Sequence, residues 1–236
     1  SLHDALPIYR IVSLNQTILP HETHIDLIGD FHNALTQIKT KYPSTKLYVA
    51  GYSYGANLLI NYLGTRNDET KMIDCGVSVS NPWDILVTDK LLEGTFEEQI
   101  FLMFSRSSLR TNVNNYPKDH KYMKYDFDKC LSAKSLWKFE EHSITKMLGY
   151  KFVDEYRRGI SCHKNVSRVN VPVLCINALD DNMTSAEGIP YTEIRSNKNI
   201  ILMTTTHGGH LYFIEHDKYL TFKHWIGKPI IGYINA

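Results

Sequence analysis

One serine of this chain stands in a setting that activates hydroxyls for nucleophilic attack. Residues 51–55 form the pattern G-x-S-x-G, with Ser53 at its centre. The pattern follows a β-rich run at 46–50 and precedes a helical run, which predicts a sharp strand-to-helix turn. Such a turn lifts the hydroxyl above a sheet, and the flanking glycines avoid collisions with the neighbouring strand and helix. A glycine-rich turn with an inert serine is the alternative.

A serine nucleophile needs a base, the base needs an orienting acid, and the developing oxyanion needs a donor. The backbone N–H of Tyr54, at the start of the predicted helix, should point at the oxyanion. Asp180 and Asp181 directly follow a β-rich run at 171–177, where the carboxyl end of a strand would place them. The expected turn length favours Asp181 as the acid and leaves Asp180 as the alternative.

The candidate bases follow the next β-rich run, at 199–204. His207 and His210 both lie there, so the order along the chain is serine, acid, histidine. The apolar Leu211 and Phe213 come after His210 and should wedge its loop, which favours His210 as the base. His207 then lies beside the site or in solvent.

The elements that would position these side chains alternate along the chain. Short apolar runs rich in Val and Ile predict buried strands at 9–14, 46–50, 73–79, 171–177 and 199–204. Apolar spacings of three and four predict helices at 25–39, from Tyr54 onward, and near 217–226. This alternation indicates the α/β class with a mostly parallel sheet.

The stretch 84–165 differs from the rest, since it is polar, aromatic and helix-like. We expect it to be a helical lid inserted into a core made of 9–83 and 166–236. Aromatic and apolar side chains in or beside it should line an acyl pocket, namely Trp83, Phe101, Leu102, Phe104, Trp137 and Phe139. Ordinary packing of these side chains is the alternative.

Composition excludes several classes of function. The 236 residues hold 26 Lys and Arg against 25 Asp and Glu, so no global field draws the chain to nucleic acid. No apolar run approaches the roughly 18 residues of a transmembrane helix.

The segment His21–His24 is one residue short of H-E-x-x-H, so no metal is predicted. Arg157 and Arg158 should be solvated or ion-paired.

The four cysteines have no C-x-x-C spacing, which indicates a reducing compartment. Cys75 and Cys175 lie in apolar runs and should be buried. We expect a cytoplasmic protein, or a membrane-associated one if a missing N-terminus carries an anchor.

Several segments together resemble one family, the YheT-type branch of the α/β-hydrolases, which includes the eukaryotic abhydrolase-domain esterases and lipases. The similar segments span about 9–226: YRIVSLN at 9–15, GYSYGANLLINYLG at 51–64, SNPWD at 80–84, the helical 139–161, VPVLCINALDD at 171–181 and HGGHLYF at 207–213. The resemblance implies a serine carboxylic ester hydrolase with Ser53, Asp181 and His210 as its triad. It implies acylglycerols, phospholipids or simpler esters as substrates and no cofactor. Asn182 departs from the family, which usually has proline there.

Two other functions fit the same residues. One is a non-catalytic binding protein with this fold, and the other is a thioesterase or peptidase that uses the same triad, because leaving-group preference depends on pocket shape.

The segment before residue 9 matches the family poorly. We expect an N-terminally incomplete chain in which 1–8 are foreign to the fold. The missing part would carry the second oxyanion donor, whose loss lowers kcat by roughly 10²–10³. The chain alone should therefore hydrolyse slowly. An ester or lipid is the expected partner, and the sequence predicts no oligomeric state.

Overall fold

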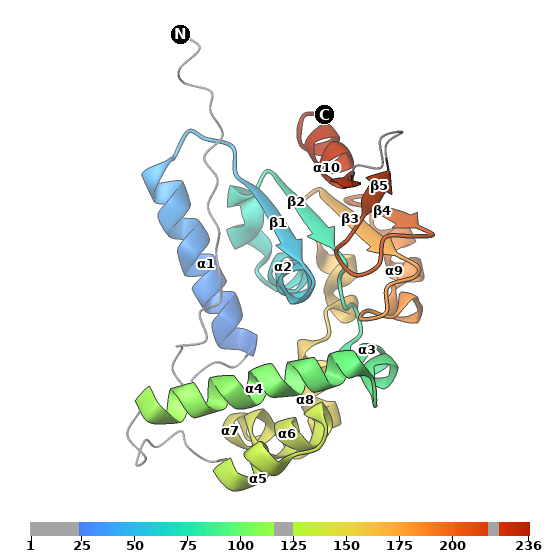
Figure 1. Cartoon of the computed structure of the whole chain (residues 1–236). Coiled ribbons are helices and arrows are strands. Elements are labelled where there is room, and N and C mark those ends of the chain that lie inside the picture. Colours follow the sequence, from blue (N-terminus) through green and yellow to red (C-terminus); the bar gives the residue numbers. More distant parts are fainter. Residues whose placement is uncertain (1–23, 116–124, 217–221) are drawn as a thin grey trace.

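A parallel four-stranded sheet forms the centre of the molecule (Figure 1). The computed structural model describes residues 24–115, 125–216 and 222–236. The strands follow one another across the sheet in chain order: β1 Tyr48–Tyr52, β2 Cys75–Val79, β3 Val173–Ala178 and β4 Ile200–Thr205. Four predicted strands and the parallel arrangement are thereby confirmed. The fifth predicted strand, at 9–14, lies outside the described residues.

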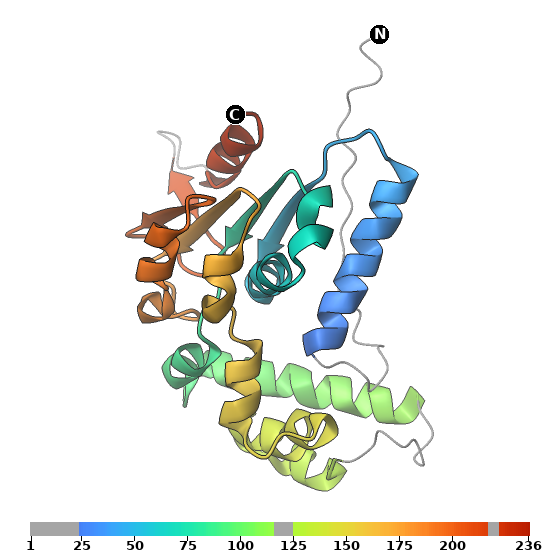
Figure 2. The same cartoon turned by 180° about the vertical axis from the view of Figure 1, so that it is seen from behind.

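Helices cover both faces of the sheet, which explains why β2 and β3 are buried along their whole length. On one face pack α1 His24–Lys41, α2 Tyr54–Thr65 and α9 Tyr191–Ser196. On the other lies α10 Gly227–Ile234 (Figure 2). Successive residues of β3 alternate between the two cores: Val173 belongs to the first and Leu174 to the second. The predicted helices at 25–39 and from Tyr54 are confirmed.

The predicted helix at 217–226 is wrong for the residues that the structure describes. Two short antiparallel strands, β5 Ile214–His216 and β6 Phe222–His224, form there, and the last helix begins only at Gly227. Tertiary packing explains the difference. The N–H of Trp225 donates to the carbonyl of Phe213 at 3.0 Å, and the two rings meet edge to face at 5.6 Å. These contacts hold the chain extended on the second core.

Helices fill the chain between β2 and β3, and the described residues of this stretch contain no strand. The helices are α3 Ile85–Leu92, α4 Phe96–Asn115, α5 Phe127–Ser132, α6 Leu136–His142, α7 Ile144–Leu148 and α8 Val153–Ile160. Figure 1 shows them gathered beyond the end of the sheet toward which the strand arrows point. The helical character predicted for this stretch is therefore observed.

Asparagines on α2 tie the two ends of this helical stretch together. The Nδ2 of Asn57 donates to the carbonyl of Pro82 at 3.0 Å, where the stretch begins. One turn later, the Nδ2 of Asn61 donates to the carbonyl of Ile160 at 3.0 Å, where α8 ends. Asn165 donates to the Oδ1 of Asn61 at 2.7 Å. Because both α2 side chains are fully buried, these bonds satisfy groups that would otherwise be costly to bury.

All four cysteines are buried and unpaired, as predicted for Cys75 and Cys175. Among the helices in the described ranges, none combines the length and apolar character needed to cross a bilayer. The segments 1–8 and His21–Thr23 lie outside the described residues.

Candidate active site

Ser53 alone makes the turn between β1 and α2. Its φ of 53° and ψ of −123° lie in a sparsely populated region, which costs a residue other than glycine about 1–3 kcal/mol. The Ser53 N–H donates to the carbonyl of Val79 at 2.9 Å, so the turn is fixed to the end of β2. The carbonyl of Ser53 accepts from the N–H groups of Ala56 and Asn57, which starts the helix. The strained turn thus presents the hydroxyl at the carboxyl edge of the sheet.

The two glycines of the motif differ in their surroundings. A Cβ on Gly51 would lie 2.4 Å from the carbonyl oxygen of Gly55, because α2 folds back closely on β1. A Cβ on Gly55 would meet nothing within 4 Å in the described part of the chain. The predicted steric need for glycine is confirmed at Gly51 and is wrong at Gly55.

The structure brings Ser53, His210 and Asp181 together in one hydrogen-bonded line. The His210 Nε2 lies 2.8 Å from the Ser53 Oγ, and the His210 Nδ1 lies 2.9 Å from the Asp181 Oδ2. With the proton on Nδ1, the ring donates to the carboxylate and accepts from the hydroxyl. The His210 side chain is 8% exposed, so little water competes for these bonds. This arrangement can remove a proton from Ser53.

The Asp181 carboxylate accepts hydrogen bonds from other groups besides His210. It accepts from the N–H of Met183 at 2.8 Å, the N–H of Thr184 at 2.9 Å and the Thr184 hydroxyl at 2.6 Å. Burial raises the pKa of Asp181, but the hydrogen bonds from His210, Thr184 and Met183 outweigh burial and leave this pKa below its ordinary value. The carboxylate is therefore ionised at neutral pH and can stabilise an imidazolium. Sequence reasoning missed Thr184, whose signal is its spacing of three from the acid.

Asp180 serves the neighbouring loop instead of the base. It accepts from the Gly209 N–H at 2.9 Å and lies 3.2 Å from the exposed His207 ring. The bond from Gly209 is the main reason why the pKa of Asp180 is lowered. Of the two acids left open by the sequence, Asp181 meets His210 and Asp180 meets His207.

Packing against Phe213 shapes the histidine loop. Phe213 is fully buried, and its N–H donates to the Gly208 carbonyl at 3.0 Å. A Cβ on Gly208 would lie 2.8 Å from the Phe213 ring, so the close approach requires glycine. The predicted wedge is thus confirmed for Phe213 and wrong for Leu211, which is 43% exposed.

The side chains expected to line an acyl pocket do not share one environment. Trp83 is buried and donates from Nε1 to the Asn177 Oδ1 at 3.1 Å, which is a packing position. Phe101 and Phe104 are exposed on α4. The remaining members are the buried Leu102, the half-buried Phe139 and the exposed Trp137. The packing alternative therefore describes Trp83 and Leu102.

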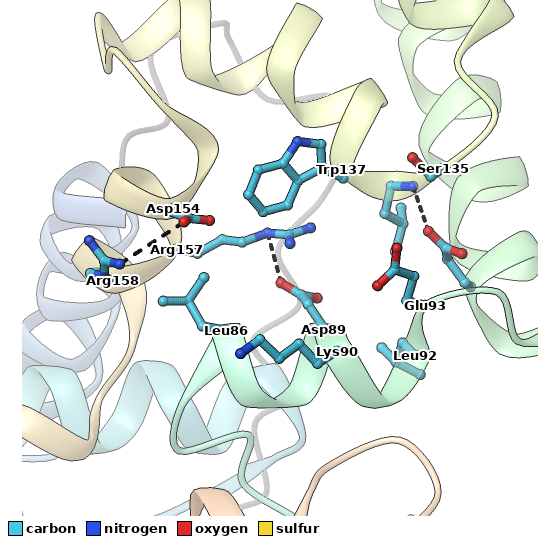
Figure 3. Close-up of a pocket in the computed structure, with 12 residues that line it drawn as sticks. Leu86, Asp89, Lys90, Leu92, Glu93, Ser135, Trp137, Asp154, Arg157 and Arg158 are labelled. Carbon is cyan, nitrogen blue, oxygen red and sulfur yellow. Dashed lines mark hydrogen bonds and ion pairs between the residues drawn. The ribbon is translucent and has the colours of Figure 1, made fainter.

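Trp137 lines a cavity of about 410 Å³ between α3, α4, α6 and α8 (Figure 3). Its ring covers the Arg157 guanidinium at 4.8 Å. The Arg157 Nε donates to the Glu140 Oε2 at 2.8 Å and lies 2.7 Å from the Asp89 Oδ2. Arg157 is thus ion-paired and buried, whereas Arg158 is exposed and lies 4.0 Å from Asp154.

One buried cation between two carboxylates leaves one negative charge uncompensated. Burial raises the pKa of Asp89 to about 7, although Arg157 opposes this, and the charges of Glu140, Glu98 and Asp84 add to it. Burial also raises the pKa of Glu140.

The charge of this ion cluster also acts on Tyr54, the residue after Ser53. Burial raises the pKa of its phenol above the usual range, and the nearby charge of Glu140 adds to the effect. The N–H of Tyr54 lies in the first turn of α2.

Within the ranges that the structure describes, no three His, Cys, Asp or Glu side chains are grouped closely enough to hold a metal ion.

The chain is similar in sequence and fold to several known proteins. No protein-family model matches the chain. The chain is 30% identical over 187 residues to the human protein named phospholipase ABHD3, covering 79% of this chain and 45% of that one. It is 26% identical over 211 residues to a Saccharomyces cerevisiae monoacylglycerol lipase, covering 87% and 46%. A solved acylaminoacyl peptidase in complex with a chloromethyl ketone superimposes with a TM-score of 0.56 at 15% identity, covering 94% of this chain and 29% of that chain.

The chain belongs to the α/β-hydrolase superfamily. As an α/β-hydrolase, it places its serine, acid and histidine after β1, β3 and β4 in the order usual for that fold. The chain spans about half the length of the curated relatives it matches.

Proposed function

We propose that this α/β-hydrolase is a serine carboxylic ester hydrolase that works through an acyl-enzyme on Ser53. One observation carries the proposal: the continuous hydrogen-bonded line from Asp181 through His210 to the Ser53 hydroxyl. The low pKa of Asp181 adds to it, because an ionised acid is what a charged imidazole needs.

In the first step the Ser53 Oγ attacks the ester carbonyl while the His210 Nε2 takes its proton. Negative charge develops on the carbonyl oxygen, and the Tyr54 N–H at the start of α2 stabilises it. The tetrahedral species collapses when His210 returns the proton to the leaving alkoxide. An alcohol departs, and the acyl group stays on Ser53.

In the second step a water molecule attacks the acyl-enzyme. His210 takes a proton from the water and then gives it back to the Ser53 oxygen, which releases the carboxylic acid and restores the serine. Asp181 remains ionised throughout, keeps the proton on Nδ1 and stabilises the imidazolium.

The substrate class follows from the relatives. Two of them are named a phospholipase and a monoacylglycerol lipase. We therefore propose acylglycerols, phospholipids or short-to-medium acyl esters as substrates. In this proposal the helices of 84–165 form a lid over the core made of 9–83 and 166–236, and Trp83, Phe101, Phe104 and Trp137 contribute to substrate binding. Contact with a membrane surface follows if the substrate is a lipid.

Covalent labelling tests the proposal. A fluorophosphonate probe reacts with activated serines, so it should label the wild-type chain and not Ser53→Ala. Ser107→Ala, which removes an exposed serine on α4, is the matched control and should label like the wild type. Unchanged labelling in Ser53→Ala, or no labelling of the wild type, contradicts the proposal.

A second assay separates the related activities. Labelled protein that turns over p-nitrophenyl esters is an esterase. Labelled protein that cleaves only thioesters or peptides is the thioesterase or peptidase alternative. Ligand binding without labelling indicates the binding-protein alternative.

A further inference from the structure

Ser80 lies directly after β2 and is completely buried. Its N–H donates to the carbonyl of Ile176 on β3 at 2.8 Å. Its hydroxyl donates to the main-chain carbonyl of His210, 130 residues further along the chain. One small side chain thus joins the ends of two strands to the backbone of the proposed base.

The backbone of Ser80 indicates that its hydroxyl is used. Its φ is +50°, a conformation that glycine adopts without strain and that serine rarely adopts. A turn with no other duty would favour glycine at this position. The hydroxyl supplies what glycine cannot, namely a hydrogen bond to the main-chain carbonyl of the buried His210.

The turn around Ser80 is braced on both sides. The Asn81 Nδ2 donates to the Ser78 Oγ at 3.2 Å, and the Asn81 carbonyl accepts from the Asn177 Nδ2 at 3.3 Å. Asn177 belongs to β3, the strand that leads into Asp181. The Ser80 hydroxyl is therefore fixed relative to the strand that carries the acid.

We propose that Ser80 is a positioning residue for His210. The contacts at both ring nitrogens hold the His210 side chain, and the Ser80 hydroxyl adds a contact to the backbone of the same residue. The Ser80 hydroxyl holds the His210 carbonyl, and so sets the distance of the ring from Ser53 while Asp181 sets its rotation. The inference rests on the proposed function for its kinetic consequence but not for its structural one.

Three variants of the full chain test the inference. Ser80→Gly removes the hydroxyl and relieves the positive φ, so it should fold with a thermal midpoint close to that of the wild type. Ser80→Thr keeps the hydroxyl but places a β-branched side chain at a positive φ, so its midpoint should fall. Asn67→Gly is the matched control, because exposed Asn67 also has a positive φ, of 33°.

Two measurements are made on each variant: the rate of fluorophosphonate labelling and the hydrogen exchange of the Gly209 and Phe213 amides. Ser80→Gly should label roughly tenfold more slowly than the wild type, as loss of one positioning hydrogen bond predicts. Its two loop amides should exchange faster. Ser80→Thr should label at nearly the wild-type rate despite its lower midpoint, and Asn67→Gly should match the wild type in both measurements.

Two results would overturn the inference, and a third separates it from the proposed function. Ser80→Gly with wild-type labelling and exchange overturns the inference, and so does Ser80→Thr that labels as slowly as Ser80→Gly. If the wild type is not labelled but the loop amides of Ser80→Gly exchange faster, the proposed function fails and the positioning role stands.

Discussion

At the scale of single residues, the two adjacent acids after β3 show how one peptide unit separates two tasks. Asp181 is buried and points to the imidazole, whereas Asp180 is partly exposed and holds the Gly209 amide. The same residue type therefore stabilises the loop conformation at position 180 and serves the proposed chemistry at position 181.

Asparagine at each position separates these tasks. Asp181→Asn should lower kcat for a p-nitrophenyl ester by roughly 10⁴, because an amide cannot keep the proton on Nδ1 or stabilise the imidazolium. Asp180→Asn keeps an oxygen that can accept from Gly209, so kcat should stay within about threefold of the wild type. Equal losses in the two variants would contradict the assignment of Asp181 as the acid.

The residues that sequence reasoning could find are those fixed by local context. Ser53, Asp181 and His210 each follow a strand end, and strand ends are visible as apolar runs that stop. Thr184 and Ser80 were not found, because their roles depend on which atoms of distant segments meet them. The same limit explains the missed β5–β6 hairpin, since the contact between Phe213 and Trp225 decides its conformation and local spacing does not.

At the scale of elements, the contact between β1 and α2 fixes the turn that holds Ser53. The helix begins one residue after Ser53 and returns over the strand so closely that Gly51 has no room for a side chain. Gly51 thus determines the angle between β1 and α2, and this angle sets the direction of the Ser53 hydroxyl.

Alanine at the two motif glycines tests this contact. Gly51→Ala should lower the free energy of unfolding by more than about 3 kcal/mol, because its Cβ would overlap backbone atoms that cannot move independently. Gly55→Ala, in open space within a helix, should change the stability by less than about 1 kcal/mol and can raise it through helix propensity. Urea denaturation measures both values. A Gly51→Ala chain as stable as Gly55→Ala would show that the helix does not pack as described.

At the scale of the whole molecule, the helical stretch after β2 makes the free energy of unfolding depend on pH. Asp89 of α3, Glu140 of α6 and Arg157 of α8 meet where three helices converge. Protonation of this cluster therefore acts on the packing of the stretch as a unit.

The free energy of unfolding should fall between about pH 4 and pH 7. The folded chain keeps a proton on Asp89 up to its pKa of about 7, whereas the unfolded chain releases that proton near its ordinary value of 3.8. The raised pKa of Glu140 acts in the same direction. Asp181 and Asp180, whose pKa values are lowered, give the opposite slope only at lower pH.

Urea midpoints at pH 5, 6, 7 and 8 measure this slope. Asp89→Asn should flatten it, because the amide carries no proton to lose. Asp154→Asn, which changes an exposed carboxylate on α8, is the matched control and should retain the wild-type slope. A wild-type chain whose stability rises over this range would contradict the buried cluster.

The asparagine bonds from α2 have a topological consequence. Asn57 and Asn61 lie one helical turn apart and bind the carbonyls of Pro82 and Ile160. The chain therefore leaves the sheet layer and returns to it at neighbouring points along α2. The chain between these two points can change in length at little additional entropic cost, because its two ends are already held close to α2. The length of the helical stretch can therefore change in evolution while β1, α2 and the turn at Ser53 keep their arrangement.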